Sequence, residues 1–236
     1  MICVLDTSRK QCRSSKSATY WGRTLSVITL ERLRDGYLRY RTHWFPDYEP
    51  LFKQLAEEGQ HPKALVVSCC DSRVNPALVF DQDPGDLFVV RNVANVIPPY
   101  APDPGCHGTS AAVEFAVTVL EVADIIVLGH AKCGGIQALI DMASGKRLPG
   151  EFLKPWISIA EPALQLAESK GESDQEHTVR AELGVVRLSL DNLTTFPWVA
   201  ERMKRGRLEL HGFYFDVHDG SVKWLNPETD SFENFA

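Results

Sequence analysis

An apolar segment that ends in three reactive side chains constrains the fold of this chain most strongly. Residues 63–68 are short, rich in β-branched side chains and preceded by the turn-forming stretch 59–62, which predicts a buried strand. Cys69, Asp71 and Arg73 follow at alternate positions. Alternate residues of an extended segment point to the same side, so these side chains are expected to face one pocket if the backbone stays extended.

The rest of the chain alternates between strand-like and helix-like segments. Strands are expected at 63–68, 87–90 and 124–129, with 208–217 as a closing strand or hairpin arm. Apolar residues at helical spacing predict helices over 30–38, 48–58, 109–120, 136–142 and 181–194. The polar stretch 168–177 is interpreted as a loop or a helix end. This order predicts an α/β fold with a mostly parallel central sheet flanked by helices.

Two remote segments are expected to meet at one edge of this sheet, because ligands of open α/β sheets bind beyond the carboxyl ends of the strands. Cys69 follows the first strand, and His130 and Cys133 follow the strand over 124–129. Either motif alone is also typical of core packing. Together, two cysteines and one histidine predict one zinc ion per chain, and three ligands with an open fourth position are typical of a catalytic site.

The charge balance argues against some partners. The chain has 236 residues and a formal charge of -6, from 31 acidic and 25 basic side chains, which does not favour nucleic acid or an anionic membrane surface. No apolar run reaches the ~20 residues that span a bilayer. Six cysteines without a secretory signal predict reduced thiols in the cytoplasm.

Residues 1–27 differ from the remainder, because they are basic and rich in serine and contain a single acid, Asp6. We interpret them as a disordered extension, with an organelle transit peptide as the alternative. Residues 28–236 are expected to form a single zinc-binding α/β domain.

The motif Cys69-x-Asp71-x-Arg73 is followed by His130-x-x-Cys133, and His130 stands 61 positions after Cys69. This pair of motifs resembles the signature of the β-class carbonic anhydrases. The likeness runs from about residue 59 to 135, and more loosely to 211–212 and 218–220. It implies zinc-dependent, reversible hydration of carbon dioxide to bicarbonate and a proton, by attack of zinc-bound hydroxide. It also implies a homodimer or a higher homo-oligomer, with N-terminal helices such as 30–38 packing on a partner subunit.

Two thiolate ligands cancel the double charge of zinc, whereas three neutral imidazoles leave it intact. The pull on the proton of bound water is therefore expected to be weaker here, and activity is expected to rise from neutral into alkaline pH. A pKa of about 7 for zinc-bound water is the value for carbonic anhydrases with three histidine ligands.

The resembled family has two arrangements of the Asp71 carboxylate. Paired with Arg73, it stays ionised and orients the nucleophile, whereas turned onto zinc it would block the fourth position. Gln60 stands where the plant-like, open-site subclass carries a substrate-side glutamine, and Val66 stands where the switching subclass carries a tryptophan. The resemblance therefore favours the open site.

The resemblance also implies an apolar wall for carbon dioxide made of Phe88, Val93 and Phe115, with plain core packing as the alternative. Phe115 stands where plant-like members carry a tyrosine, so any role of that hydroxyl is absent. Two other functions stay open: hydrolysis of COS or CS2 on the same scaffold, and zinc binding by a regulatory protein without turnover.

Overall fold

The computed structural model describes residues 29–165 and 173–236. The chain divides into two compact units, Met1–Lys53 and Gln54–Ala236. The basic stretch 1–27, expected to be an extension, lies outside the described residues. Within the described part, no helix is both long and apolar enough to cross a membrane.

The described part of the first unit is helical. It contains α1 (Leu30–Arg39), a π-helical turn η2 (Tyr40–Trp44) and the beginning of α2 (Phe45–Glu58). The Thr29 hydroxyl caps α1 by accepting a hydrogen bond from the Arg32 N–H at 3.3 Å. The helices expected over 30–38 and 48–58 are confirmed, although α2 begins three residues early.

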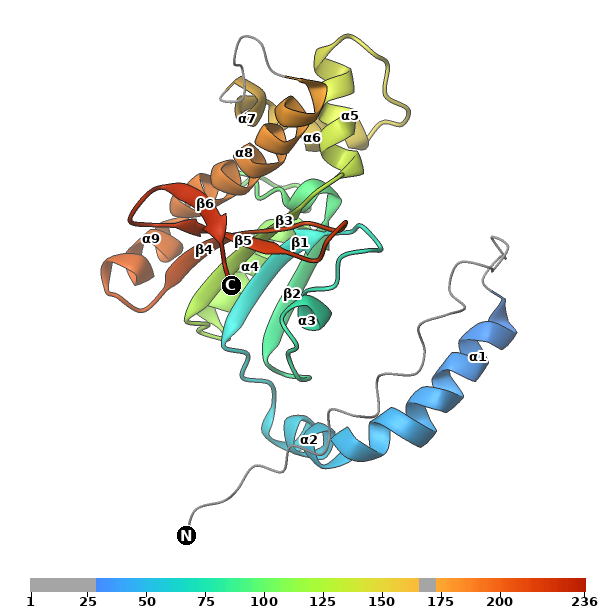
Figure 1. Cartoon of the computed structure of the whole chain (residues 1–236). Helices are drawn as coiled ribbons and strands as arrows, with labels where there is room; N and C mark the ends of the chain where they lie inside the picture. The colour runs from blue at the N-terminus through green and yellow to red at the C-terminus, as the bar shows by residue number, and fades with distance from the viewer. Residues whose placement is uncertain (1–28, 166–172) are drawn as a thin grey trace. The chain divides into compact units, whose positions relative to one another are not determined.

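The second unit is built on one six-stranded sheet with the order β2-β1-β3-β4-β5-β6 (Figure 1). The strands are β1 (Ala64–Cys69), β2 (Leu87–Asn92), β3 (Asp124–His130), β4 (Glu209–Phe215), β5 (Val222–Asn226) and β6 (Ser231–Asn234). The first four strands of this order are parallel to one another, and β5 and β6 are antiparallel additions. The expected α/β class with a mostly parallel sheet is confirmed.

The register of the parallel strands places their carboxyl ends together. Ser68 of β1 pairs with Leu128 of β3, so β3 continues two residues further, to His130. Every residue of β1 is buried, because helices and loops cover both of its faces.

Helices fill the space around the sheet. They are α3 (Pro76–Val79), the 3-10 turn η3 (Val93–Asn95), α4 (Gly108–Thr118), α5 (Gly134–Ala143), α6 (Leu153–Ser158), α7 (Glu161–Gln165), α8 (Asp174–Thr194) and α9 (Pro197–Lys204). The helix expected over 181–194 begins seven residues earlier, at Asp174, because Ser173 and Glu176 form a capping box. This start lies inside the polar stretch 168–177, whose first five residues are outside the described part.

Two of the three buried clusters position the candidate site, one in the body of the sheet and one at its carboxyl end. One buried cluster joins β1 and β3 to α4, α8 and α9 and includes Val67, Ile125 and Val186. A second cluster packs α5 and α6 against α8 and includes both Cys69 and Cys133. Figure 1 shows α8 running from the helices of this second cluster along the sheet. The carboxyl end of the sheet is therefore supported by apolar packing.

Candidate metal centre

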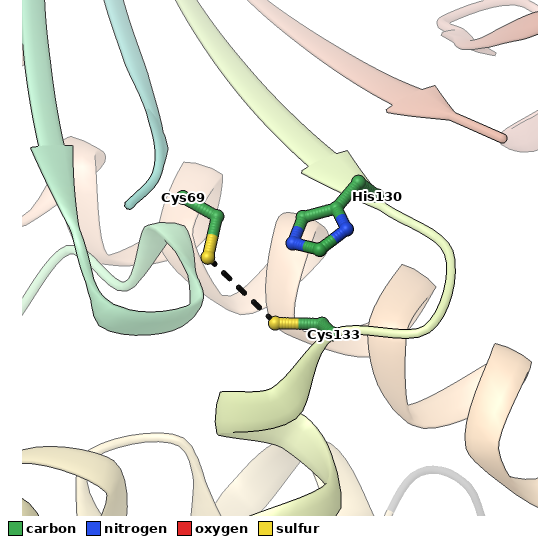
Figure 2. Close-up of side chains that lie close together, drawn as sticks. All are labelled: Cys69, His130 and Cys133. Carbon is green, nitrogen blue, oxygen red and sulfur yellow. Dashed lines mark hydrogen bonds between the residues drawn. The ribbon is translucent and has the colours of Figure 1, made fainter. Parts of the chain in front are cut away.

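Three side chains of metal-ligating type converge at the carboxyl end of the sheet. Cys69 is the last residue of β1, His130 is the last residue of β3, and Cys133 directly precedes α5. Their ligand atoms all lie within 4.8 Å of one another, and all three residues are buried. Figure 2 shows the two thiols and the imidazole turned toward a common point. The parallel register thus brings together residues that are 61 positions apart.

The geometry of these donors fits zinc. The two sulfur atoms are 3.9 Å apart, which is far beyond the ~2.05 Å of a disulfide. Two sulfurs bound at ~2.3 Å to a tetrahedral zinc would be separated by roughly 3.8 Å. His130 Nδ1 lies 2.9 Å from the carbonyl oxygen of Ala131, so it is assigned as the protonated nitrogen. His130 Nε2 is buried and has no hydrogen-bond partner in the described part of the chain, so its lone pair is free for a metal.

The electrostatics of the two thiols also favour a cation. The hydrogen bond with Cys133 lowers the pKa of Cys69 to about 4, and the backbone N–H groups of Asp71 and Ala94 assist. The hydrogen bond to Cys69 raises the pKa of Cys133, and burial adds to this effect. Two thiolates this close repel each other, so in a metal-free site Cys133 keeps its proton. A divalent cation would take the place of that proton.

The backbone around the centre is strained. Ala94, Asn95 and Lys132 adopt left-handed conformations with φ of 64°, 48° and 58°. Such values are uncommon for residues other than glycine and persist only where the surroundings enforce them. Gly135 contributes to this fit, because a Cβ there would lie 2.8 Å from Val93 Cγ1 and 2.9 Å from the Cβ of Ala94.

The Asp71 carboxylate lies beside the centre but is held by Arg73. Asp71 Oδ1 accepts from Arg73 Nε and the Arg73 backbone N–H, both at 2.9 Å, and Oδ2 accepts from the second guanidinium nitrogen at 2.7 Å. These hydrogen bonds hold the pKa of Asp71 well below its usual range. Arg73 also donates to the carbonyl of Lys132 at 2.9 Å. Asp71 Oδ2 remains 3.9 Å from His130 Nε2, so the carboxylate faces the ligands.

The residues expected to line the substrate side are less closely assembled than the three side chains of the metal centre. They are Gln60, Phe88, Val93 and Phe115. The rings of Phe88 and Phe115 pack with their centroids 5.8 Å apart. Val93 adjoins Ala94 and lines a cavity of about 730 Å³, together with Trp156 and neighbouring residues, but none of the three residues of the candidate metal centre lines it. Gln60 is exposed between α2 and β1, and within the described residues no hydrogen bond joins it to the centre.

A second group of metal-ligating atoms fits a metal less well. Asp124, Glu209 and His211 gather at the amino ends of β3 and β4. The imidazole of His211 is already hydrogen-bonded to Asp124 Oδ1 at 2.8 Å, and the Glu209 side chain is mostly exposed. This cluster is therefore explained as a surface hydrogen-bonded group.

No sequence pattern predicts a role at the centre for three of its polar residues, Arg91, Glu182 and Tyr214. Arg91 donates to the carbonyls of Cys69 at 2.9 Å and Asp71 at 2.7 Å, and so holds the backbone of the first motif. Glu182 of α8 accepts hydrogen bonds from the Cys133 N–H and from the hydroxyl of Tyr214. One signal was present for Glu182, since it is an acid at helical spacing from the apolar residues Val185 and Val186 of α8.

Comparisons with known proteins give a consistent result. A family model described as carbonic anhydrase matches residues 64–222. A carbonic anhydrase of Pseudomonas aeruginosa is 39% identical over 210 residues, which are 86% of this chain and 90% of the relative. The mitochondrial β carbonic anhydrase 6 of Arabidopsis thaliana is 38% identical over 200 residues, covering 83% of this chain and 67% of the relative.

Solved structures agree with this result. The β-carbonic anhydrase CcaA superposes with a TM-score of 0.81 at 33% identity, covering 87% of this chain and 92% of that one. A structure from a study of two tetrameric β-carbonic anhydrases of Sordaria macrospora has a TM-score of 0.62 at 28% identity, with coverages of 83% and 93%.

Proposed function

The chain belongs to the β-carbonic anhydrase family, and on that premise we propose that Cys69, His130 and Cys133 hold one zinc ion that serves the reversible hydration of carbon dioxide. The observation that carries the proposal is the buried pair of sulfurs 3.9 Å apart beside His130 Nε2, which has no hydrogen-bond partner among the described residues. Zinc bound there would act as a Lewis acid that activates water for attack on the substrate carbon.

Asp71 and Arg73 are proposed to orient the attacking water. Arg73 occupies both carboxylate oxygens of Asp71 and keeps the group ionised, so Asp71 is a hydrogen-bond acceptor at neutral pH. The position of Oδ2 near His130 Nε2 directs that acceptor toward the metal-binding point. The open arrangement is thereby supported, because a carboxylate bound at both oxygens by a guanidinium is restrained from turning onto the metal.

Phe88, Val93 and Phe115 are proposed to form the apolar side of the substrate path, with Gln60 as its polar member. The packed pair of phenylalanines and the partial exposure of Val93 support this assignment. Gln60 is exposed in the single chain, so its participation depends on a partner subunit. We propose a homo-oligomer for this reason and because tetramers occur among the structural relatives.

The cytoplasm is the proposed location. Organelle import through residues 1–27 is the alternative, and one relative is named mitochondrial.

The decisive experiment measures carbon dioxide hydration by stopped flow and zinc content on the same purified sample. We expect about one zinc per chain and hydration that is lost with the metal when a chelator is added. Cys133→Ser should lose both. Zinc without hydration would favour a regulatory protein or COS and CS2 as substrates, and absence of zinc from a folded sample would contradict the proposed centre.

A further inference from the structure

Glu182 is a buried acid that touches the metal centre without being a ligand. Its side chain extends from α8, and the residue is 2% exposed. Its Oε1 accepts a hydrogen bond from the backbone N–H of Cys133 at 3.0 Å, and its Oε2 accepts from the Tyr214 hydroxyl at 2.7 Å. Tyr214 lies on β4 opposite Gly129 of β3, one residue before His130. Glu182 therefore connects α8, β4 and the segment that carries two of the three ligands.

Packing alone does not explain an acid at this position. Both donors to Glu182 are neutral, a backbone amide and a phenol. Burial raises the pKa of Glu182, and the hydrogen bonds from Tyr214 and Cys133 only partly offset this effect. Within the described residues no lysine or arginine donates to Glu182, and a buried carboxylate without a cationic partner is unfavourable, whereas an apolar residue of similar volume would pack there without that penalty.

The hydrogen bond that Glu182 accepts from the Cys133 N–H constrains the loop between β3 and α5 where its backbone reverses direction. Lys132 has a left-handed φ of 58°, and Cys133 returns to an extended conformation with φ -71° and ψ 117°. This reversal turns the Cys133 side chain toward Cys69. The Cys133 amide precedes α5, so no helical carbonyl satisfies it, and Glu182 supplies the acceptor.

We propose that Glu182, held by Tyr214, is a positioning residue that fixes the Cys133 end of the metal loop and thereby sets how tightly the centre retains zinc. The inference rests on the proposed function, which supplies the zinc. Hydrogen-bonded partners of metal ligands typically change metal affinity by about 10–100-fold when they are removed.

The test compares zinc dissociation constants and release rates, measured by competition with a chromogenic chelator, in the wild type, four variants and one control variant. Glu182→Leu should weaken zinc binding by about 10–100-fold. Glu182→Gln should stay close to the wild type, because its amide oxygen accepts from Cys133 and its NH2 donates to the Tyr214 oxygen. Tyr214→Phe should weaken binding less than Glu182→Leu does, and should add nothing when combined with it.

Asn192→Ala is the matched control. Asn192 also extends from α8 and donates to a backbone carbonyl, that of Ile97 at 2.8 Å, but it contacts no ligand. Its loss should lower the unfolding temperature of the metal-free protein and leave zinc affinity unchanged. If Glu182→Leu behaves like this control, the inference is overturned; should that variant fail to fold, Tyr214→Phe decides in the same way. A wild type that binds no zinc would instead contradict the proposed function.

Discussion

The position of one carboxylate distinguishes an open metal site from a blocked one. Asp71 Oδ2 lies 3.9 Å from His130 Nε2, a proposed ligand atom, yet it accepts a hydrogen bond from Arg73 at 2.7 Å. An Asp71→Asn variant keeps the shape but loses the charge that the guanidinium holds. We expect zinc content to be unchanged and kcat to fall by about 10–100-fold, because the acceptor that orients water is weakened. Stopped-flow hydration and metal analysis on one sample measure both.

Asp141→Asn provides the control for this variant. Asp141 is paired with Lys146 at 2.9 Å on the surface, so its loss should change neither zinc content nor kcat. Loss of zinc in Asp71→Asn would show that Asp71 is a ligand and would contradict the open arrangement.

The pH dependence of hydration should not originate in Asp71. Arg73 lowers the pKa of this carboxyl, so its ion pair is fully present above the ordinary value for aspartate and is lost only as the pH falls through the lowered pKa, in strong acid. Asp71 is therefore ionised throughout the neutral and alkaline range. We expect hydration to rise from about pH 7 to about pH 9 in the wild type, and with lower amplitude in Asp71→Asn. A flat wild-type profile, or a rise that vanishes in the variant, would be incompatible with this assignment.

At the scale of single residues, the sequence predicts the candidate metal ligands but not the side chains that hold the backbone of those ligands in place. Cys69, His130 and Cys133 could be expected at one place because each adjoins the end of a recognisable strand. Arg91 and Glu182 act on backbone atoms of residues 22 and 49 positions away. No spacing rule encodes such contacts, since they depend on where the loops and α8 lie.

The start of α5 shows how an element positions the centre. A Cβ at Gly135 would lie within 3 Å of side-chain atoms of Val93 and Ala94, whereas one at Gly134 would meet no atom within 4 Å. We expect Gly135→Ala to displace η3, lower the free energy of unfolding by about 1–3 kcal/mol and weaken zinc retention. Gly134→Ala should be neutral or slightly stabilising, since alanine favours a helix. Thermal unfolding and zinc release compare the pair, and equal behaviour would contradict the close packing of α5 on η3.

The elements differ in how well their sequences predicted them. β1 and β3 were expected to within one or two residues, because continuous apolar runs between turns mark strands covered on both faces. The short helices α6, α7 and α9 were not expected, since five to eight residues carry little periodicity. β5 and β6 are only partly buried, and pairing with neighbouring strands defines them more than their own pattern does.

On the scale of the whole molecule, α1 exposes an apolar stripe. Leu30, Leu33, Tyr37 and Leu38 recur at helical spacing, and at least half of each side chain is exposed. A partner subunit would explain this surface. We expect Leu33→Glu combined with Tyr37→Glu to shift the protein to a smaller assembly in light scattering, with Arg32→Glu, on the opposite exposed side of α1, as the control. An unchanged mass in the double variant would show that this stripe is not part of the assembly.

The parallel pairing of β1 with β3 also orders events during folding. A newly synthesised chain exposes Cys69 long before His130 and Cys133 exist, and a single thiolate binds zinc weakly. The three proposed ligands become neighbours only after the segment between Cys69 and His130 has closed a loop and both strands have aligned in register. Zinc held at the proposed centre would therefore bind only after this long-range contact is complete, so it would slow the unfolding of the sheet but would not nucleate it.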